Sequence, residues 1–518
     1  MTFGSWTTQR LLENTSQQEP AMVLLKKNGS RIVYSWKDYE NKVRRVLRAL
    51  RHLGIGKGDF VVLAAPNLPE SFFVLLGTIA AGAVPVPINL PLLKEPGQNE
   101  FLSIVVNCRP KLILASSCLA KYLSKVKYMT FEELLFRGSI VAEPIKPDDI
   151  KTDPNSLLIM PYTSGTTGNP KGVMLSTENI LDRVSAIVHE LKATSQERIL
   201  SYLSLGHISE LVATFFGQLY GGYCVYFTEY TQDTLENREK FRTAFPLILR
   251  TVRPTVFLAV PKVWTNIRKQ IEHKTRYVPL DLGKQGLIRD FVVSKIRGRL
   301  GFDETRHFVS AGSKISPEDT NFFAKLGIRI SDVYGQTETG GPLALNGKIL
   351  GNASVTVGEG SEILVSGPNV MLGYYNNPEV TRQVLNKGIY RTGDIGRWTD
   401  KTVFYAGRLR DGFKNAQGEF VTSAKIEELE DKARKIPGVD EVIICGDGKP
   451  YPVALVFSAA PSEELKNRLK TALPKVESGL FMIGNFLLAD LSAVELTPTL
   501  KVKRNATIKK FEKEISKL

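Results

Sequence analysis

Cysteine and histidine are scarce in this chain of 518 residues, which contains only four cysteines and five histidines. The histidines are scattered and give no zinc pattern, and the cysteines show no paired metal-ligand spacing: Cys108, Cys118, Cys224 and Cys445. Structural zinc sites and disulfide scaffolds both need clusters of these residues. The sequence therefore argues against a zinc-binding or disulfide-stapled protein and favours a reducing compartment, the cytoplasm.

No secretion signal is found, since the N-terminal segment has no apolar core of signal-peptide length. The stretch Ser71–Leu93 carries no charge and is long enough to span a bilayer. Three prolines interrupt it: Pro85, Pro87 and Pro91. A transmembrane helix is the alternative, but we expect a buried helix up to about Ala81 followed by a buried strand over Val84–Ile88.

Acidic residues are outnumbered, because 68 Lys and Arg against 53 Asp and Glu give a net charge of +15. No motif interleaves aromatic and basic residues, so nucleic acid is not the expected partner. The charge fits attraction to ATP, coenzyme A (CoA) or an anionic membrane bound peripherally, although solubility alone would also explain it. The excess is concentrated after Leu500, in Lys501, Lys503, Arg504, Lys509, Lys510, Lys513 and Lys517.

The chain is too long for one ordinary hydrophobic core, so two or more domains are expected. Its 43% hydrophobic and 23% charged residues fit a globular enzyme. Strand and helix patterns alternate along it without a repeat of fixed period, which predicts α/β layers. The sequence gives no indication of the oligomeric state.

The most distinctive segment is Tyr162–Gly172, with the sequence Y-T-S-G-T-T-G-N-P-K-G. Its glycines let an anion approach the backbone, its hydroxyl groups donate hydrogen bonds, and its lysine adds positive charge. These residues are Gly165 and Gly168; Thr163, Ser164, Thr166 and Thr167; and Lys171. It is not a Walker loop, because the second glycine would fall at Pro170. Apolar runs on both sides predict a polyphosphate-binding loop between two strands, and an ordinary turn is the alternative.

This segment resembles the signature loop of the acyl-adenylate-forming enzymes, which include acyl-CoA synthetases, luciferases and peptide-synthetase adenylation domains. The resemblance extends over roughly residues 20–515. It implies an α/β fold with a large multi-layer N-terminal adenylation domain over residues 1–407. A hinge at 408–410 would then lead into a small, mobile α+β C-terminal domain over 411–518.

Two segments, Ser201–Glu210 and Arg253–Trp264, resemble the long-chain branch of this family, including its bubblegum-type members. The resemblance implies that His207 faces the carboxylate and the α-phosphate, whereas a histidine considered alone is more often a packed core residue. It also implies that Trp264 gates an acyl tunnel. A core aromatic residue beneath a helix is the alternative for Trp264.

The adenine side of the family's nucleotide site matches two segments. Phe308–Ser313 reads as a strand that enters a turn of small residues, where a flat ring can lie against the backbone: Ala311, Gly312 and Ser313. In Asp332–Thr339, the resemblance implies that Tyr334 packs on the adenine, with Gly335 next to it.

The phosphate, metal and ribose contacts are also implied by the resemblance. Thr337 would reach the α-phosphate, and Glu338 would hold Mg²⁺, which prefers one or two carboxylates together with phosphate oxygens. Asp394, on a Thr-Gly turn, would accept hydrogen bonds from the ribose hydroxyls. Arg408 would contact the ribose or a phosphate.

The C-terminal domain contributes the remaining residues that the resemblance implies. Arg410 occupies the hinge position, which is usually Asp or Lys in relatives, and Gly418 would line the CoA tunnel. Lys503 aligns with the catalytic lysine, and Lys501 is its rival. Ser423 departs from the pattern because many relatives have proline there.

These features predict an ATP-dependent long-chain fatty acid:CoA ligase that forms acyl-AMP and pyrophosphate and then acyl-CoA. The expected cosubstrates are ATP and CoA, with Mg²⁺ as the metal. One alternative is a fatty acyl-AMP ligase that loads the phosphopantetheine of an acyl carrier protein. A non-catalytic protein that binds a nucleotide or acyl-AMP is a second.

Overall fold

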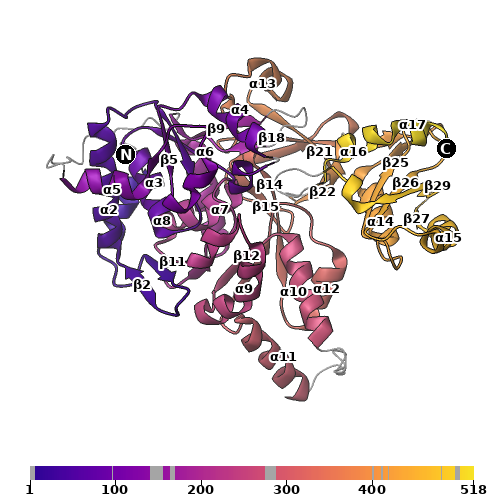
Figure 1. Ribbon diagram of the computed structural model, residues 1–518, viewed down its shortest axis with the longest axis horizontal. Coiled ribbons are helices and arrows are strands. Elements are labelled where there is room, and N and C mark those ends of the chain that lie inside the picture. Colours follow the sequence, from indigo (N-terminus) through magenta and orange to yellow (C-terminus); the bar gives the residue numbers. More distant parts are fainter. Residues whose placement is uncertain are drawn as a thin grey trace. The chain divides into compact units, whose positions relative to one another are not determined.

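The computed structural model describes residues 6–95, 97–140, 156–163, 170–274, 287–399, 402–409, 412–417, 419–479, 481–495 and 502–518. The chain divides into two compact units (Figure 1). The larger unit contains the chain up to Ser354 together with Val365–Tyr390. The smaller contains Val355–Leu364 and the chain from Arg391 onward. The mixed α/β class expected from the sequence is confirmed.

The main sheet of the larger unit has the strand order β2-β1-β11-β10-β12-β13-β14-β15-β16. Neighbours from β1 to β14 run parallel, whereas β2, β15 and β16 are antiparallel to their neighbours. Central strands such as β11 are buried and apolar, as expected for a parallel sheet covered on both faces. The strands are β1 (Met22–Leu25), β2 (Arg31–Tyr34), β10 (Arg198–Leu200), β11 (Cys224–Thr228), β12 (Val256–Ala259), β13 (His307–Ser310), β14 (Ile330–Gln336), β15 (Gly341–Leu345) and β16 (Lys348–Ile349).

A second, parallel sheet has the order β4-β3-β5-β6. The expected buried helix and strand within Ser71–Leu93 are confirmed as α3 (Pro69–Ala80) and β4 (Val84–Pro87). Proline is tolerated in β4 because this strand lies at the sheet edge. The part of the chain that the structure describes contains no helix with the length and apolarity needed to cross a membrane. The other elements are β3 (Phe60–Ala64), β5 (Leu112–Ala115), β6 (Met129–Thr130), α2 (Trp36–His52), α4 (Gln98–Cys108) and α5 (Phe131–Ile140).

A third, small sheet carries the signature segment. Strands β7 (Leu157–Ile159) and β9 (Lys171–Ser176) pair antiparallel, and β8 (Tyr162–Thr163) and β19 (Gly373–Tyr374) also pair with β9. The prediction of strands on both sides of the loop is therefore confirmed. Helix α6 (Thr177–Glu190) follows β9 and begins with a capping box at Ser176.

Further helices of the larger unit pack on the main sheet or on one another. Helix α9 packs on β10 and on α11, and α12 packs on β14 and α10. Their bounds are α1 (Trp6–Asn14), α7 (Ile208–Glu210), a π-helical turn η4 (Leu211–Phe216), α8 (Gly217–Gly221), η5 (Glu229–Asp233), α9 (Arg238–Val252), α10 (Pro261–Lys274), α11 (Leu287–Leu300), α12 (Pro317–Lys325) and α13 (Pro378–Val384).

The smaller unit has its own hydrophobic core, formed where α14 and α15 cover the sheet β25-β26-β29. A long hairpin of β21 and β22 precedes this core. The unit therefore takes in segments 355–364 and 391–407, which the family resemblance assigns to the adenylation domain. The bounds are β17 (Ser354–Val357), β18 (Glu362–Ser366), β21 (Ile389–Thr399), β22 (Thr402–Arg408), α14 (Ser423–Ala433), β25 (Glu441–Cys445), β26 (Val453–Ser458), α15 (Glu463–Ala472), β29 (Asn485–Asp490), α16 (Arg504–Lys510) and α17 (Glu512–Ser516).

Candidate functional site

The two ends of the signature loop meet on the small sheet. Thr163 in β8 pairs with Lys171 in β9, and Tyr162 pairs with Gly172. A Cβ atom at Gly172 would come within 2.9 Å of the Tyr162 ring, so a larger residue here would force that ring to shift. The rest of the predicted phosphate loop lies outside the described residues: Ser164, Gly165, Thr166, Thr167 and Gly168.

The side chain of Tyr374 connects Lys171 with Glu338. The Lys171 ammonium lies 5.2 Å from the centre of the Tyr374 ring, within the range of a cation–π contact. The Tyr374 hydroxyl donates a hydrogen bond of 2.9 Å to the Glu338 carboxylate. The backbone N–H of Met371 also donates to the carbonyl of Glu338, at 2.9 Å. A cation and a carboxylate predicted for the same site are thus held together by one phenol.

The predicted adenine segments lie at the carboxyl ends of adjacent parallel strands. Strand β13 ends at Ser310, next to Asp332 in β14, so the turn of small residues (Ala311, Gly312 and Ser313) and the segment from Tyr334 to Glu338 both lie beyond this paired region. Ligands of open α/β sheets bind at such carboxyl edges. Gly335 has no room for a side chain, because a Cβ atom there would lie 2.1 Å from the carbonyl oxygen of Gly341.

The turn that carries Thr337 and Glu338 is fixed from both sides. The hydroxyl of Thr339 accepts a hydrogen bond of 3.0 Å from the backbone N–H of Gln336. The Tyr390 hydroxyl donates to the amide oxygen of the Gln336 side chain at 2.6 Å. The turn is therefore held by bonds within the protein itself, which reduces the cost of ordering it around a ligand.

His207 is exposed at the beginning of α7. Its Nε2 lies 3.4 Å from the Nδ2 of Asn89, which follows β4. The two loops touch closely, because a Cβ atom at Gly206 would lie 2.6 Å from the backbone nitrogen of Asn89. An exposed ring does not fit the alternative interpretation of His207 as a packed core residue.

Trp264 on α10 is fully buried, and its indole packs edge-on against Phe257 and Phe323 with ring centres 5.1 Å apart in each pair. This packing is what the alternative interpretation of a core aromatic residue requires. The gating role of Trp264 remains a prediction.

A buried carboxylate, Glu210, lies three residues after His207. It is 1% exposed and accepts hydrogen bonds from the Ser201 hydroxyl at 2.5 Å and the Asn67 amide at 3.0 Å. The Thr214 hydroxyl lies 3.0 Å from the same oxygen. Ser201 and Glu210 bracket the loop that bears His207, so the carboxylate holds this loop at both ends. A π-helical turn follows at once, a feature frequent near functional sites.

Burial raises the pKa of Glu210 to about 7, although the hydrogen bonds from Ser201, Thr214 and Asn67 act in the opposite direction. Because the folded pKa lies above the ordinary 4.5, the contribution of this carboxyl to stability is complete below pH 4.5 and is lost as the pH rises through about 7. We expect Glu210→Gln to remove this component, which at about 1.4 kcal/mol per pKa unit reaches up to about 3 kcal/mol.

Urea unfolding of the wild type and of Glu210→Gln at pH 5 and pH 8 measures this effect. The variant should lose less stability between the two pH values than the wild type does. The exposed Glu239 provides a matched control, and Glu239→Gln should follow the wild type. An identical pH dependence of the wild type and Glu210→Gln would contradict the assignment.

In the smaller unit, Asp394 is 1% exposed and pairs with Arg408, whose Nε lies 3.0 Å from its Oδ1. The hydroxyl of Thr392 accepts from the backbone N–H of Asp394 at 3.0 Å, which fixes the turn. Lys503 is exposed just before α16, and its backbone N–H donates to Glu495 at 2.7 Å. Three further predicted residues lie outside the described residues. They are the hinge residue Arg410, the CoA-tunnel residue Gly418, and Lys501, which is the alternative to Lys503 as the catalytic lysine.

Comparison with known protein families identifies residues 12–375 as a match to the model of the AMP-binding enzyme family. The chain belongs to the AMP-binding enzyme family. The resemblance to acyl-adenylate-forming enzymes that the sequence indicated is therefore confirmed, and the protein is an enzyme of this class.

Curated relatives of this AMP-binding enzyme belong to the bubblegum-type branch that the sequence indicated. The chain is 26% identical to the long-chain-fatty-acid–CoA ligase ACSBG2 of Rattus norvegicus, covering 85% of this chain and 75% of the relative. It is 27% identical to the ligase ACSBG1 of Homo sapiens, covering 80% of this chain and 65% of the relative.

Solved structures share the fold over nearly the whole chain. The McyG adenylation and carrier-protein domains in complex with phenylalanyl-adenylate match with a TM-score of 0.78, at 18% identity and over 98% of this chain and 83% of that one. The o-succinylbenzoate CoA synthetase of Bacillus subtilis, with ATP and magnesium ion, matches with a TM-score of 0.72, at 20% identity and over 96% and 98%.

The side chains of the AMP-binding enzyme fit a magnesium ion that takes one ligand from the protein and others from phosphate oxygens. Across the described residues, no group of three or more His, Cys, Asp or Glu side chains could hold a metal alone. Glu338 offers a single carboxylate, already oriented by Tyr374, which suits an ion that keeps most of its ligands from phosphate and water.

Two features of the AMP-binding enzyme escaped the sequence analysis. Tyr374 has no predicted role in the site, and nothing in the spacing of its segment indicates a bond to Glu338. Glu210 reads as one more charged residue in a long-chain segment. A lone glutamate followed by the apolar run 211–216 is the signal that could have indicated its burial.

Proposed function

We propose that this AMP-binding enzyme activates a long-chain fatty carboxylate with ATP and transfers the acyl group to CoA. The arrangement of Lys171, Tyr374 and Glu338 supports the proposal, because one phenol contacts both a lysine of the signature loop and a carboxylate that could hold a metal. The names of the curated relatives support the long-chain acid and CoA as substrates.

In the first step, a carboxylate oxygen of the acid attacks the α-phosphorus of ATP, and the bond to the bridging oxygen breaks. Pyrophosphate leaves and an acyl-AMP mixed anhydride forms. Both reactants are anionic, so the enzyme must cancel their repulsion and align them. Lys171 and Lys503 supply positive charge, Thr337 donates to the α-phosphate, and His207 faces the acid. Glu338, together with the phosphates, would hold magnesium, which would supply positive charge against the departing pyrophosphate.

The nucleotide is held by residues that do not react. Tyr334 and the turn Ala311–Ser313 would contact the adenine, and Asp394 would accept hydrogen bonds from both ribose hydroxyls. The ion pair with Arg408 orients the Asp394 carboxylate for this purpose.

In the second step, the CoA thiolate attacks the acyl carbonyl, the thioester forms, and AMP leaves with its electron pair. The family resemblance supports a rotation of the C-terminal domain about Arg410 between the steps, after which Gly418 would line the path of the pantetheine. Such alternation lets one small domain serve both half-reactions.

A carrier protein is the second candidate acceptor. The likeness of the fold to an adenylation domain linked to its carrier protein favours this alternative. Chemically the acceptors are equivalent, because both present a phosphopantetheine thiol. The two candidates differ only in what surrounds that thiol.

An ATP–pyrophosphate exchange assay over short, medium, long and aromatic acids tests the proposal. We expect exchange with palmitate to exceed that with acetate or benzoate by at least about tenfold, or 1.4 kcal/mol in transition-state stabilisation. Adding CoA should then yield palmitoyl-CoA, whereas an acyl carrier protein should remain unloaded. Loading of the carrier protein without palmitoyl-CoA would favour the second candidate, and no exchange with any acid would refute both.

A further inference from the structure

Helix α9 presents an exposed face that combines an apolar side chain with basic ones. Leu247 is 57% exposed, whereas the next residues, Ile248 and Leu249, are buried in the core. Lys240 and Arg250, at helical spacing on either side of Leu247, are exposed as well. A leucine between two cations on one face is the composition of helices that lie at a lipid–water interface.

The neighbouring helix α11, which packs on α9, repeats this composition. Phe291 is 63% exposed, and the Lys295 ammonium lies 5.3 Å from its ring centre. Arg299, two turns beyond Phe291, is exposed too. Neighbouring helices thus each carry one exposed large apolar side chain with lysine and arginine around it.

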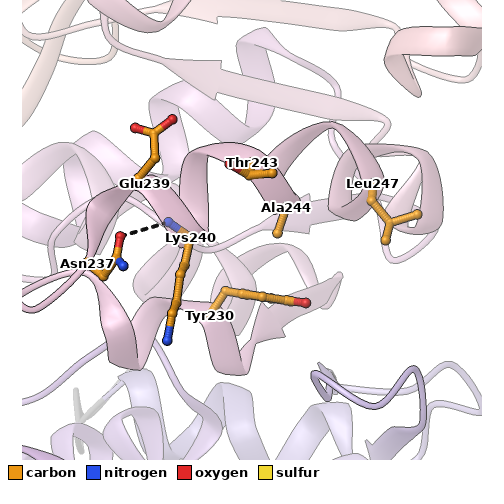
Figure 2. A pocket seen from close by; sticks show the side chains of 7 residues that line it. All are labelled: Tyr230, Asn237, Glu239, Lys240, Thr243, Ala244 and Leu247. Atoms are coloured by element: carbon orange, nitrogen blue, oxygen red, sulfur yellow. Dashed lines mark hydrogen bonds between the residues drawn. The ribbon is translucent and has the colours of Figure 1, made fainter.

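A groove runs along the same face of α9. Its volume is about 500 Å³, and its lining includes Tyr230, Lys240, Ala244 and Leu247. Figure 2 shows Lys240, Ala244 and Leu247 in line along the helix with Tyr230 beneath them. Tyr230 and Ala244 pack against the core cluster that contains Trp264. The apolar surface of the groove is therefore continuous with that cluster.

The charge balance of this surface is strongly positive. In α9 the exposed charged residues are Arg238, Lys240, Arg242 and Arg250 against Glu239 alone, and from Phe291 onward the exposed charged residues of α11 are Lys295 and Arg299. Nearby acids already have partners, since Glu239 pairs with Arg242, Asp233 with Lys27, and Asp303 with Arg253. In the described part of the chain, no carboxylate pairs with Lys240, Arg250, Lys295 or Arg299.

We propose that α9 and α11 form a docking surface for an anionic lipid bilayer. Leu247 and Phe291 enter the boundary between headgroups and acyl chains, while the surrounding lysines and arginines contact lipid phosphates. The biological meaning rests on the proposed function, because a long-chain acid is delivered from the bilayer in which it dissolves. The docking itself depends only on the surface.

Co-sedimentation with vesicles tests the proposal. The wild type should bind vesicles of phosphatidylcholine with phosphatidylserine, bind weakly to phosphatidylcholine alone, and lose most binding at high salt. Each basic residue removed should lower partitioning about fivefold. Lys240→Gln, Arg250→Gln, Lys295→Gln and Arg299→Gln combined should therefore lose more than about a hundredfold. The pair Leu247→Ser and Phe291→Ser should also bind more weakly.

Two matched controls locate the effect. The first control removes the same amount of charge from the C-terminal tail, with the substitutions Lys509→Gln, Lys510→Gln, Lys513→Gln and Lys517→Gln. The second control removes two apolar side chains that are exposed elsewhere on the protein, by 71% and 67%, with Val106→Ser and Phe136→Ser. Both controls should bind vesicles as the wild type does. All variants should keep the pyrophosphate exchange rate of the wild type with a dissolved medium-chain acid, which shows that they fold.

Absence of wild-type binding to anionic vesicles would overturn the proposal. Loss of binding in the tail control, with retention in the α9 and α11 variants, would also overturn it. Vesicle binding that follows the expected pattern in a protein without pyrophosphate exchange would support the docking surface while refuting the proposed function.

Discussion

Replacing Lys503 with alanine should reduce acyl-adenylate formation by about 10²–10³-fold, the usual effect of losing one donor that stabilises transition-state charge. Adenylation brings a carboxylate to a triphosphate, so a lysine that neutralises charge as pyrophosphate leaves acts mainly in this step. Lys503 is exposed just before α16, while its backbone is anchored to Glu495 and Thr507. The variant should therefore remain folded.

Thioester formation from supplied acyl-AMP should largely survive in Lys503→Ala, because no pyrophosphate leaves in that step. Pyrophosphate exchange measures the first half-reaction, and CoA-dependent consumption of synthetic acyl-AMP measures the second. Lys509→Ala, which removes an exposed lysine of α16, is the matched control and should change neither half-reaction. Equal loss of both half-reactions would refute the role of Lys503 in adenylation. A larger loss of pyrophosphate exchange in Lys501→Ala than in Lys503→Ala would assign that role to Lys501.

Local patterns were sufficient for the elements around the signature loop. The apolar run Leu157–Met160 and the segment after Pro170 predicted strands, and β7 and β9 occur there. The prolines of Ser71–Leu93 predicted that a helix would give way to an extended segment, as α3 and β4 do. Both predictions succeed because periodicity and proline act within a few residues of the chain.

Contacts between distant segments could not be predicted in this way. The guanidinium of Arg183 is fully buried, pairs with Asp182, and donates to the carbonyls of Pro342 and Leu350 at 3.0 Å each. Helix α6 thereby holds the strands that follow the Glu338 turn. A buried arginine on a helix has the same sequence pattern as an exposed one. Only the tertiary structure therefore reveals that Arg183 connects helix α6 to these strands.

The division into two compact units also depends on contacts between segments that are distant in the sequence. Segment 355–364 belongs to the smaller unit, although the larger unit continues at Val365. Thr392 donates to the carbonyl of Ile363 at 2.7 Å, and Gly393 donates to the carboxylate of Glu362 at 3.0 Å. These bonds join parts of the chain about thirty residues apart, which a boundary placed by family motifs does not capture.

Replacing Glu338 with glutamine should lower pyrophosphate exchange by about 10²–10³-fold, because it removes the carboxylate proposed to hold magnesium while keeping its size. The amide oxygen can still accept the hydrogen bond of the Tyr374 hydroxyl, so the turn should keep its shape. The residual activity should also require more magnesium than the wild type. Exchange rates over a magnesium titration measure both effects.

Tyr374→Phe separates the charge of Glu338 from its orientation. The ring that contacts Lys171 remains, and only the hydroxyl that donates to Glu338 is lost. Exchange should fall by about tenfold, as expected for one hydrogen bond to a charged group, and excess magnesium should restore part of it. Tyr375→Phe is the matched control, because that ring packs on Phe60 and should leave exchange unchanged. If Glu338→Gln kept the wild-type rate and magnesium dependence, the metal would have to be held elsewhere and the proposed reaction would lose its central residue.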